Sequence, residues 1–169
     1  MEALAEHTIV ITGLKDGLHS FDMELGDSFF AASGMEEFLG GRTMAHLDLE
    51  KTNHLYVASI QVDGHVTMLC DRCNSRMEQP VHGSQRQIFQ LNGDGESDDD
   101  ELVNLDPATT EINFTHYFFE CISLNLPIRH VHPAGQCDPE VTRVLEKLQV
   151  HHEPDPRWSA LQKLKKPGA

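Results

Sequence analysis

The sequence has little positive charge for its length of 169 residues. Thirteen Lys and Arg residues stand against 27 Asp and Glu residues, which gives a formal net charge of −14. Nucleic-acid affinity rests mainly on Lys and Arg side chains that neutralise phosphates. This shortage argues against general RNA or DNA binding by the whole surface, and an acidic chain suits a basic partner such as a ribosomal protein.

Long apolar runs are also missing. No segment approaches the roughly 18 consecutive apolar residues that a membrane-spanning helix needs. Residues 1–11 contain Glu2 and Glu6 but no Lys or Arg, so they lack the basic start of a signal peptide. We therefore expect a cytoplasmic protein with no membrane partner, and its four cysteines should stay reduced.

Recognisable catalytic motifs are absent as well. The sequence contains no P-loop, no GxGxxG motif before a helix and no HExxH motif. Its 11 histidines are scattered, and none lies in a Ser/His/Asp or Cys/His pattern typical of catalysis. We therefore expect a protein that acts by binding, with no enzymatic activity and no small-molecule substrate.

The sequence does contain a series of strand patterns, and its length suits a single domain with its own hydrophobic core. Residues 7–12 and 18–25 predict a first β-hairpin. Asp63-Gly64 predicts a second hairpin turn. Further strands are predicted at residues 42–49, 55–62, 65–69, 80–91 and 102–105. The middle of the chain should therefore form an antiparallel meander.

Helical patterns accompany the strands. Capping residues and apolar spacing predict short helices between Asp27 and Gly34, between Asn113 and Pro127, and over residues 139–149 after Asp138. The expected fold class is α+β. It combines an antiparallel sheet, open or barrel-like, with two or three short helices in the C-terminal half.

Residues 92–101 (NGDGESDDDE) hold six acidic side chains. Such a segment cannot bury enough apolar surface to offset the entropy of ordering it. We therefore expect a disordered acidic loop within a single domain of residues 1–150. The loop either stays solvated or contacts a basic partner.

A candidate metal site is formed by four residues from two separate segments. Cys70 and Cys73 form a CxxC pair after a predicted strand, and His132 and Cys137 lie on a later turn rich in Pro and Gly. Three thiolates and one imidazole complete a four-coordinate shell that is typical of structural zinc and leaves no position for a catalytic water. Zinc here would fasten the helical C-terminal part to the strands.

Other interpretations of these residues stay open. The cysteines can be buried thiols without a metal. The CxxC can be a redox pair, although that motif normally opens a helix within a βαβ unit. His130 is an alternative nitrogen ligand, and Cys121 is interpreted as a core residue of its helix.

The last 13 residues carry a local charge of +4 and contain no Asp or Glu. Residues 151–169 are interpreted as a linker followed by a short basic amphipathic tail. The tail either packs its apolar stripe onto the domain or brings its cations to rRNA phosphates, and the two are compatible. The candidate contact residues for RNA or a partner are Arg157, Trp158, Lys163, Lys165 and Lys166.

Three segments carry a family resemblance through their order and spacing. They are CDRC at Cys70 to Cys73, SLNLPIRHVHPAGQCDPEV at Ser123 to Val141, and DPRWSALQKLK at Asp155 to Lys165. Together they resemble the YceD family of bacterial large ribosomal RNA subunit accumulation proteins. The DPRW segment is similar to the form of the Bacteroidetes group. Cys121 departs from the family pattern, which leaves the number of metal ligands open.

The resemblance implies a non-enzymatic role in accumulation or processing of 23S rRNA, and hence in biogenesis of the 50S ribosomal subunit. Family members are commonly encoded beside the gene for ribosomal protein L32, which suggests L32 or a 50S assembly intermediate as a partner. Two other hypotheses stay open. One is a zinc-dependent nuclease or hydrolase that trims precursor rRNA and needs an open metal position; the other is a zinc-stabilised structural scaffold.

Overall fold

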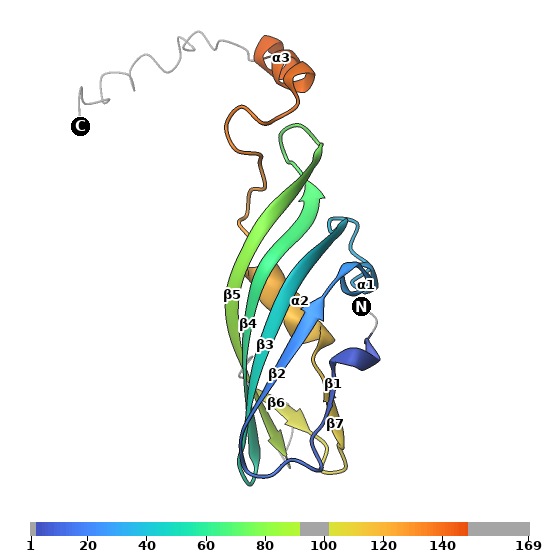
Figure 1. Cartoon of the computed structure of the whole chain (residues 1–169), viewed down its shortest axis with the longest axis vertical. Coiled ribbons are helices and arrows are strands. Elements are labelled where there is room, and N and C mark those ends of the chain that lie inside the picture. Colours follow the sequence, from blue (N-terminus) through green and yellow to red (C-terminus); the bar gives the residue numbers. More distant parts are fainter. Residues whose placement is uncertain (1–2, 92–101, 149–169) are drawn as a thin grey trace, which may run out of the picture.

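A long twisted sheet of five strands, in the order β2-β3-β4-β5-β6, dominates the computed structural model (Figure 1), which describes residues 3–91 and 102–148. The strands are β2 (Gly17–Leu25), β3 (Gly40–Lys51), β4 (Leu55–Leu69), β5 (Arg76–Leu91) and β6 (Leu102–Leu105). The first four form an antiparallel meander, and β6 pairs in parallel with β5. The predicted α+β class is confirmed, and the sheet is open, with β2 and β6 at its edges.

A second, two-stranded sheet corrects one prediction. The strand β1 (Thr8–Val10), which follows the 3-10 turn η1 (Ala5–His7), pairs with β7 (Glu111–Asn113). The predicted hairpin of residues 7–12 with 18–25 is therefore wrong. The side chain of Asn113 donates hydrogen bonds to the Leu4 carbonyl oxygen at 2.8 Å and to Thr8 Oγ1 at 2.7 Å. These contacts tie the N-terminal segment to a strand about a hundred residues away.

The Asp63-Gly64 pair is also not a turn. The strand β4 passes through it without interruption, and Gly64 is paired with Thr43 on one side and Val81 on the other. Gly64 has φ +157°, and a Cβ there would lie 2.3 Å from the Arg42 carbonyl oxygen. Glycine is required at this position because the backbone of β3 approaches closely, and the chain does not reverse there.

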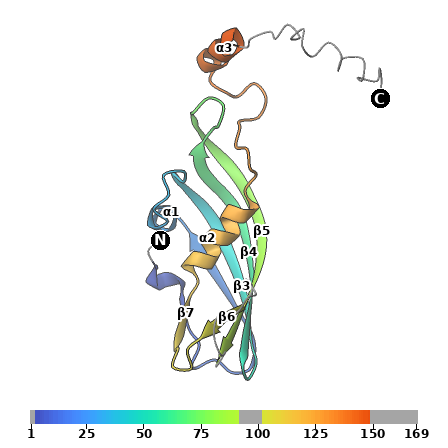
Figure 2. The ribbon, with the colours of Figure 1, turned by 180° about the vertical axis from the view of Figure 1, so that it is seen from behind.

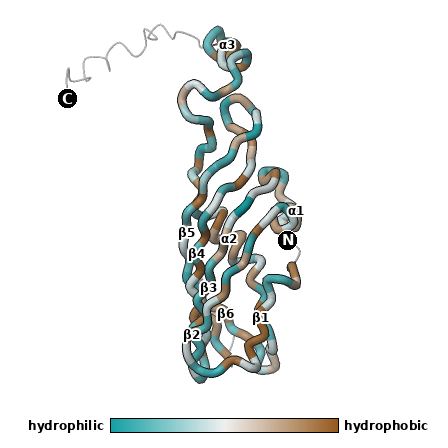
Figure 3. Tube along the Cα trace, viewed as in Figure 1, coloured by the Kyte–Doolittle hydropathy of each residue, from teal (hydrophilic) through white to brown (hydrophobic). Residues whose placement is uncertain are grey.

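The helices α1 (Asp27–Ala32) and α2 (Thr115–Asn125) pack on one face of the sheet (Figure 2). The core between them and the sheet includes fully buried side chains from both helices and from β5, among them Phe29, Phe30, Phe89, Phe118 and Ile122. Each such side chain contributes roughly 1.5–3 kcal/mol through burial. Hydrophobic and hydrophilic residues alternate along the strands (Figure 3), so the opposite face is polar.

The caps of the first two helices bear out the predictions in part. The Thr115 amide donates to Asn113 Oδ1 at 3.1 Å, so Asn113 satisfies one of the free amides at the start of α2. Asp27 does not cap α1. Its carboxylate instead accepts a hydrogen bond from the Gly41 amide at 3.1 Å and joins the helix to β3.

The helix α3 (Pro139–Leu148) lies beyond the end of the sheet, and none of its residues is buried (Figure 1). Asp138 caps it as predicted, because its Oδ1 accepts from the amides of Glu140 at 2.8 Å and Val141 at 3.3 Å. The two helices predicted for the C-terminal half are therefore both present, but only α2 covers the sheet.

Two predicted features lie outside the described residues. These are the acidic loop at 92–101 and the linker and basic tail at 151–169, so the domain boundaries stay predictions. Within residues 3–91 and 102–148, the structure contains no helix of the length and apolarity needed to cross a membrane.

Gly64→Ala should destabilise the fold, because its Cβ would meet backbone atoms of β3 that cannot move aside. We expect a loss of about 1–3 kcal/mol in the free energy of unfolding, measured by urea denaturation. Gly13→Ala is the matched control, since nothing lies within 4 Å of a Cβ at that position. Equal stability of the two variants would contradict the close approach of β3 and β4.

Candidate metal centre

The first half of the site is the turn that joins β4 to β5. Cys70 directly follows β4, and its amide donates to the Ser75 carbonyl oxygen at 2.9 Å. The Asn74 amide donates back to the Cys70 carbonyl oxygen at 2.8 Å, and Asn74 itself has φ 56°, in the left-handed region that Asn tolerates. This tight turn presents the sulfur atoms of Cys70 and Cys73 together.

The second half is the segment between α2 and α3. The Gln136 amide donates to the Pro133 carbonyl oxygen at 3.0 Å and closes a turn between His132 and Cys137. The three sulfur atoms and one imidazole nitrogen lie within 4.8 Å of one another. The structure thus brings together all four predicted ligands: Cys70, Cys73, His132 and Cys137.

The distances within the cluster fit a tetrahedral ion. The Sγ atoms of Cys70 and Cys137 are 4.0 Å apart, and Cys73 Sγ lies 3.3 Å from His132 Nδ1. A zinc ion with Zn–S bonds of 2.3 Å holds its sulfur ligands about 3.8 Å apart. The second nitrogen of His132, Nε2, lies 3.2 Å from the Arg76 carbonyl oxygen, so it carries the hydrogen and leaves Nδ1 free for a metal.

The surroundings of Cys70 and Cys73 favour the thiolate form that metals bind. Burial opposes ionisation of Cys70, but hydrogen bonds from the backbone of His132 and of its own turn outweigh it and lower its pKa to about 6. Backbone hydrogen bonds, chiefly from Asp138, lower the pKa of Cys73. Burial and the neighbouring sulfur atoms raise the pKa of Cys137. The Cys137 thiol would therefore lose its proton when a metal binds.

Two other candidate residues lie outside this cluster. Cys121 is fully buried in α2, and burial raises the pKa of its thiol to about 11, as expected for a core residue. His130 is not among the four clustered ligands. The CxxC turn joins two antiparallel strands and opens no helix, which disfavours the thioredoxin-like redox interpretation.

A second link beside the metal cluster was missed from the sequence. The Asp71 amide donates to the His130 carbonyl oxygen at 2.8 Å, and the His130 amide donates to Asp71 Oδ2 at 2.6 Å. The reciprocal pair fastens the CxxC turn to the segment after α2 without any metal. No local pattern signals it, although Asp71 lies within the CDRC motif.

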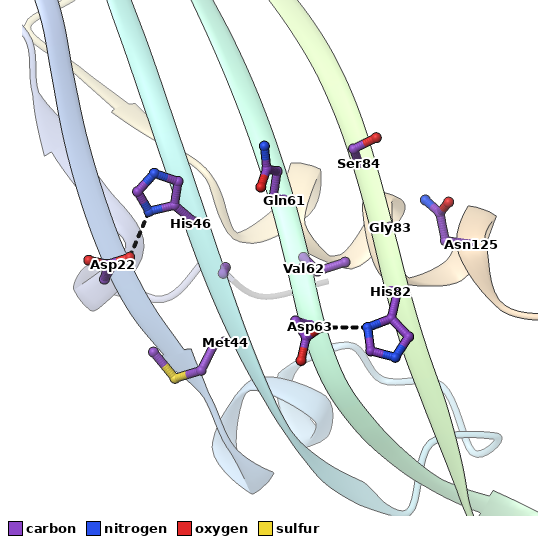
Figure 4. A pocket seen from close by; sticks show the side chains of 11 residues that line it. Asp22, Met44, His46, Gln61, Val62, Asp63, His82, Gly83, Ser84 and Asn125 are labelled. Atoms are coloured by element: carbon purple, nitrogen blue, oxygen red, sulfur yellow. Dashed lines mark hydrogen bonds and ion pairs between the residues drawn. The ribbon is translucent and has the colours of Figure 1, made fainter.

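The sheet face turned away from α2 is polar and largely acidic. His46 lies between two carboxylates, 2.7 Å from Asp22 and 3.3 Å from Asp48, and the hydrogen bond that it donates to Asp22 raises its pKa. Asp63 and His82 form a second pair across β4 and β5 (Figure 4). The charged residues of this face are Asp22, Glu24, Asp48, Glu50, Asp63 and Glu78, against Arg42, Arg76 and Arg86.

The predicted contact residues of the tail cannot be located on this surface. Arg157, Trp158, Lys163, Lys165 and Lys166 all lie outside the described residues. Their role therefore stays a prediction.

Comparison with known families gives one match. The model described as large ribosomal RNA subunit accumulation protein YceD matches residues 58–165, which extend from β4 through all four clustered ligands and into the basic tail. Neither the curated proteins nor the solved structures contain a match to the chain.

Asp71→Ala should destabilise the protein by about 1–2 kcal/mol, because it leaves the His130 amide without its acceptor. Asp71→Asn keeps a neutral acceptor and should lose less. Asp16→Ala, at an exposed position without such a contact, is the control and should stay within about 0.5 kcal/mol of the parent. Urea denaturation measures all three, and an unchanged Asp71→Ala variant would rule out the link.

Proposed function

Because the chain belongs to the YceD family of large ribosomal RNA subunit accumulation proteins, we propose that it is a non-enzymatic accessory factor in biogenesis of the 50S subunit. It acts in the cytoplasm and promotes accumulation or processing of 23S rRNA. It does so by binding a basic ribosomal protein, with L32 as the first candidate, or precursor rRNA. The single observation that carries this proposal is the family match over residues 58–165.

The geometry of the four clustered ligands supports a structural role for the metal. Three thiolates and one imidazole are the donor set of structural zinc sites, and soft thiolates favour zinc over magnesium or calcium. Four protein ligands leave no position at which a metal-bound water would attack a substrate. Zinc bound by these residues would stabilise the position of the segment between α2 and α3.

The charge distribution supports a basic protein partner. Six carboxylates and three guanidinium groups lie on the sheet face turned away from α2, with two His–Asp pairs among them. The last 13 residues differ from this face, because they carry a net charge of +4 and contain no acidic side chain. A chain with both features can hold a basic ribosomal protein by its body and contact rRNA by its tail.

The zinc hypothesis predicts about one zinc ion per chain in protein purified without chelators. Cys73→Ser and Cys137→Ser should each lose most of this metal and should lower the melting temperature. Cys121→Ala should keep it, because Cys121 lies in the core outside the cluster. Elemental analysis and X-ray absorption spectroscopy provide the measurements. A shell of three protein ligands and one water would contradict a structural site and support a hydrolase.

The binding hypothesis predicts that the tagged protein, recovered from its own cells, retains ribosomal proteins or 50S precursors. The variant with Lys163→Glu, Lys165→Glu and Lys166→Glu should associate more weakly and with a flatter dependence on salt, because each phosphate contact contributes to that dependence. Lys15→Glu, on an exposed loop, is the control for a change of charge.

Two outcomes of this pull-down count against the proposal, at different levels. Unchanged association of the triple variant would remove the role of the tail alone. An eluate without any ribosomal protein or precursor particle, at low as well as physiological salt, would remove the proposed function.

A further inference from the structure

A groove runs between the CxxC turn and α3, beside the metal cluster. Arg72 of the CxxC turn lines this groove, as do Arg143 and Glu146 of α3. The turn of residues 133–135 also lines it with the short side chains Pro, Ala and Gly. The groove is therefore open to a ligand between two arginines that come from distant parts of the chain.

The two arginines are exposed, and within residues 3–91 and 102–148 neither guanidinium group has a hydrogen bond or ion pair with another residue. On the acidic face of the sheet, the guanidinium group of Arg42 pairs with Glu24 at 2.7 Å. Arg72 and Arg143 thus keep their donors available despite 27 acidic residues in the sequence. Among the described residues that line the groove, Glu146 is the one carboxylate, and Cys137 of the metal cluster lines it as well.

The chemistry of these side chains selects the ligand. A guanidinium group is planar, always charged, and donates paired hydrogen bonds that match a phosphate group. Two guanidinium groups that line one groove suit a phosphodiester ligand.

We propose that the groove between Arg72 and Arg143 binds a backbone phosphate of RNA. This inference rests on the RNA-binding part of the proposed function and adds a site within the folded domain. The metal cluster has an indirect role in this site, because a metal bound by His132 and Cys137 would hold the segment that lines the groove. Arg72 and Arg143 make the contact, and the clustered ligands position them.

The test measures binding of the full-length, metal-loaded protein to a labelled single-stranded RNA of mixed sequence, by fluorescence anisotropy over a range of salt. Arg72→Ala and Arg143→Ala should each weaken binding by about 3- to 10-fold, and the double variant should reduce the slope of log K against log salt by about 1 to 2. Arg143→Lys should keep most of the slope but lose affinity, because lysine lacks the paired donors.

The control is Arg86→Ala, which removes an exposed arginine from the polar face of β5 and should leave RNA binding unchanged. Each variant must match the parent protein in metal content and melting temperature. The substitutions of Arg143 should disturb the fold least, because no residue of α3 is buried. If Arg86→Ala weakens RNA binding as much as Arg143→Ala does, the loss of affinity reflects the overall charge of the protein. The proposed phosphate site in the groove is then wrong.

The remaining outcomes separate this site from the proposed function. If the arginine variants bind RNA like the parent while the triple tail variant binds weakly, only the groove is wrong. If the parent binds no RNA but retains ribosomal proteins from cells, the groove and the RNA contact both fail, and the protein-binding half of the proposed function stands.

Discussion

The convergence of two distant turns at one end of the sheet determines the arrangement of residues 126–148, the described segment after α2. Cys73 and His132 are 59 residues apart in the sequence, yet their ligand atoms lie 3.3 Å apart. Two of the three thiols, Cys70 and Cys73, have lowered pKa values, so negative charge gathers where the sulfur atoms meet. A divalent cation would offset that repulsion, so the four residues form a candidate metal site.

The sheet and its covering helix depend on a different kind of interaction. Phe114, Phe118 and Ile122 of the α2 region are fully buried against β4 and β5, and this apolar packing needs no metal. By contrast, α3 has no buried residue. Its place relative to the sheet therefore depends on the preceding segment, which is held by the cluster and by the reciprocal Asp71–His130 hydrogen bonds. The groove between Arg72 and Arg143 exists only if that segment is held.

Charge is distributed unevenly over the protein. This uneven distribution suits a role in ribosome formation, where both basic and acidic partners are present. Carboxylates dominate the sheet face turned away from α2, whereas unpaired arginines flank the groove near α3. Assembly of a ribosomal subunit brings basic proteins and acidic RNA together. A factor that offers carboxylates on one surface and guanidinium groups on another can contact both kinds of molecule.

Sequence alone determined the features that local chemistry dictates. Period-two alternation located most strands, and Asp138 marked the start of α3. The spacing of Cys70 with Cys73 and of His132 with Cys137 identified both halves of the candidate metal site. Tertiary structure decided the partners: β1 pairs with β7, β4 continues through Gly64, and Asp71 bonds to His130. The physical reason is the distance along the chain over which each kind of sequence pattern acts. Periodicity, capping and ligand spacing act over a few residues, whereas strand pairing and close backbone approach depend on segments that meet only in the folded chain.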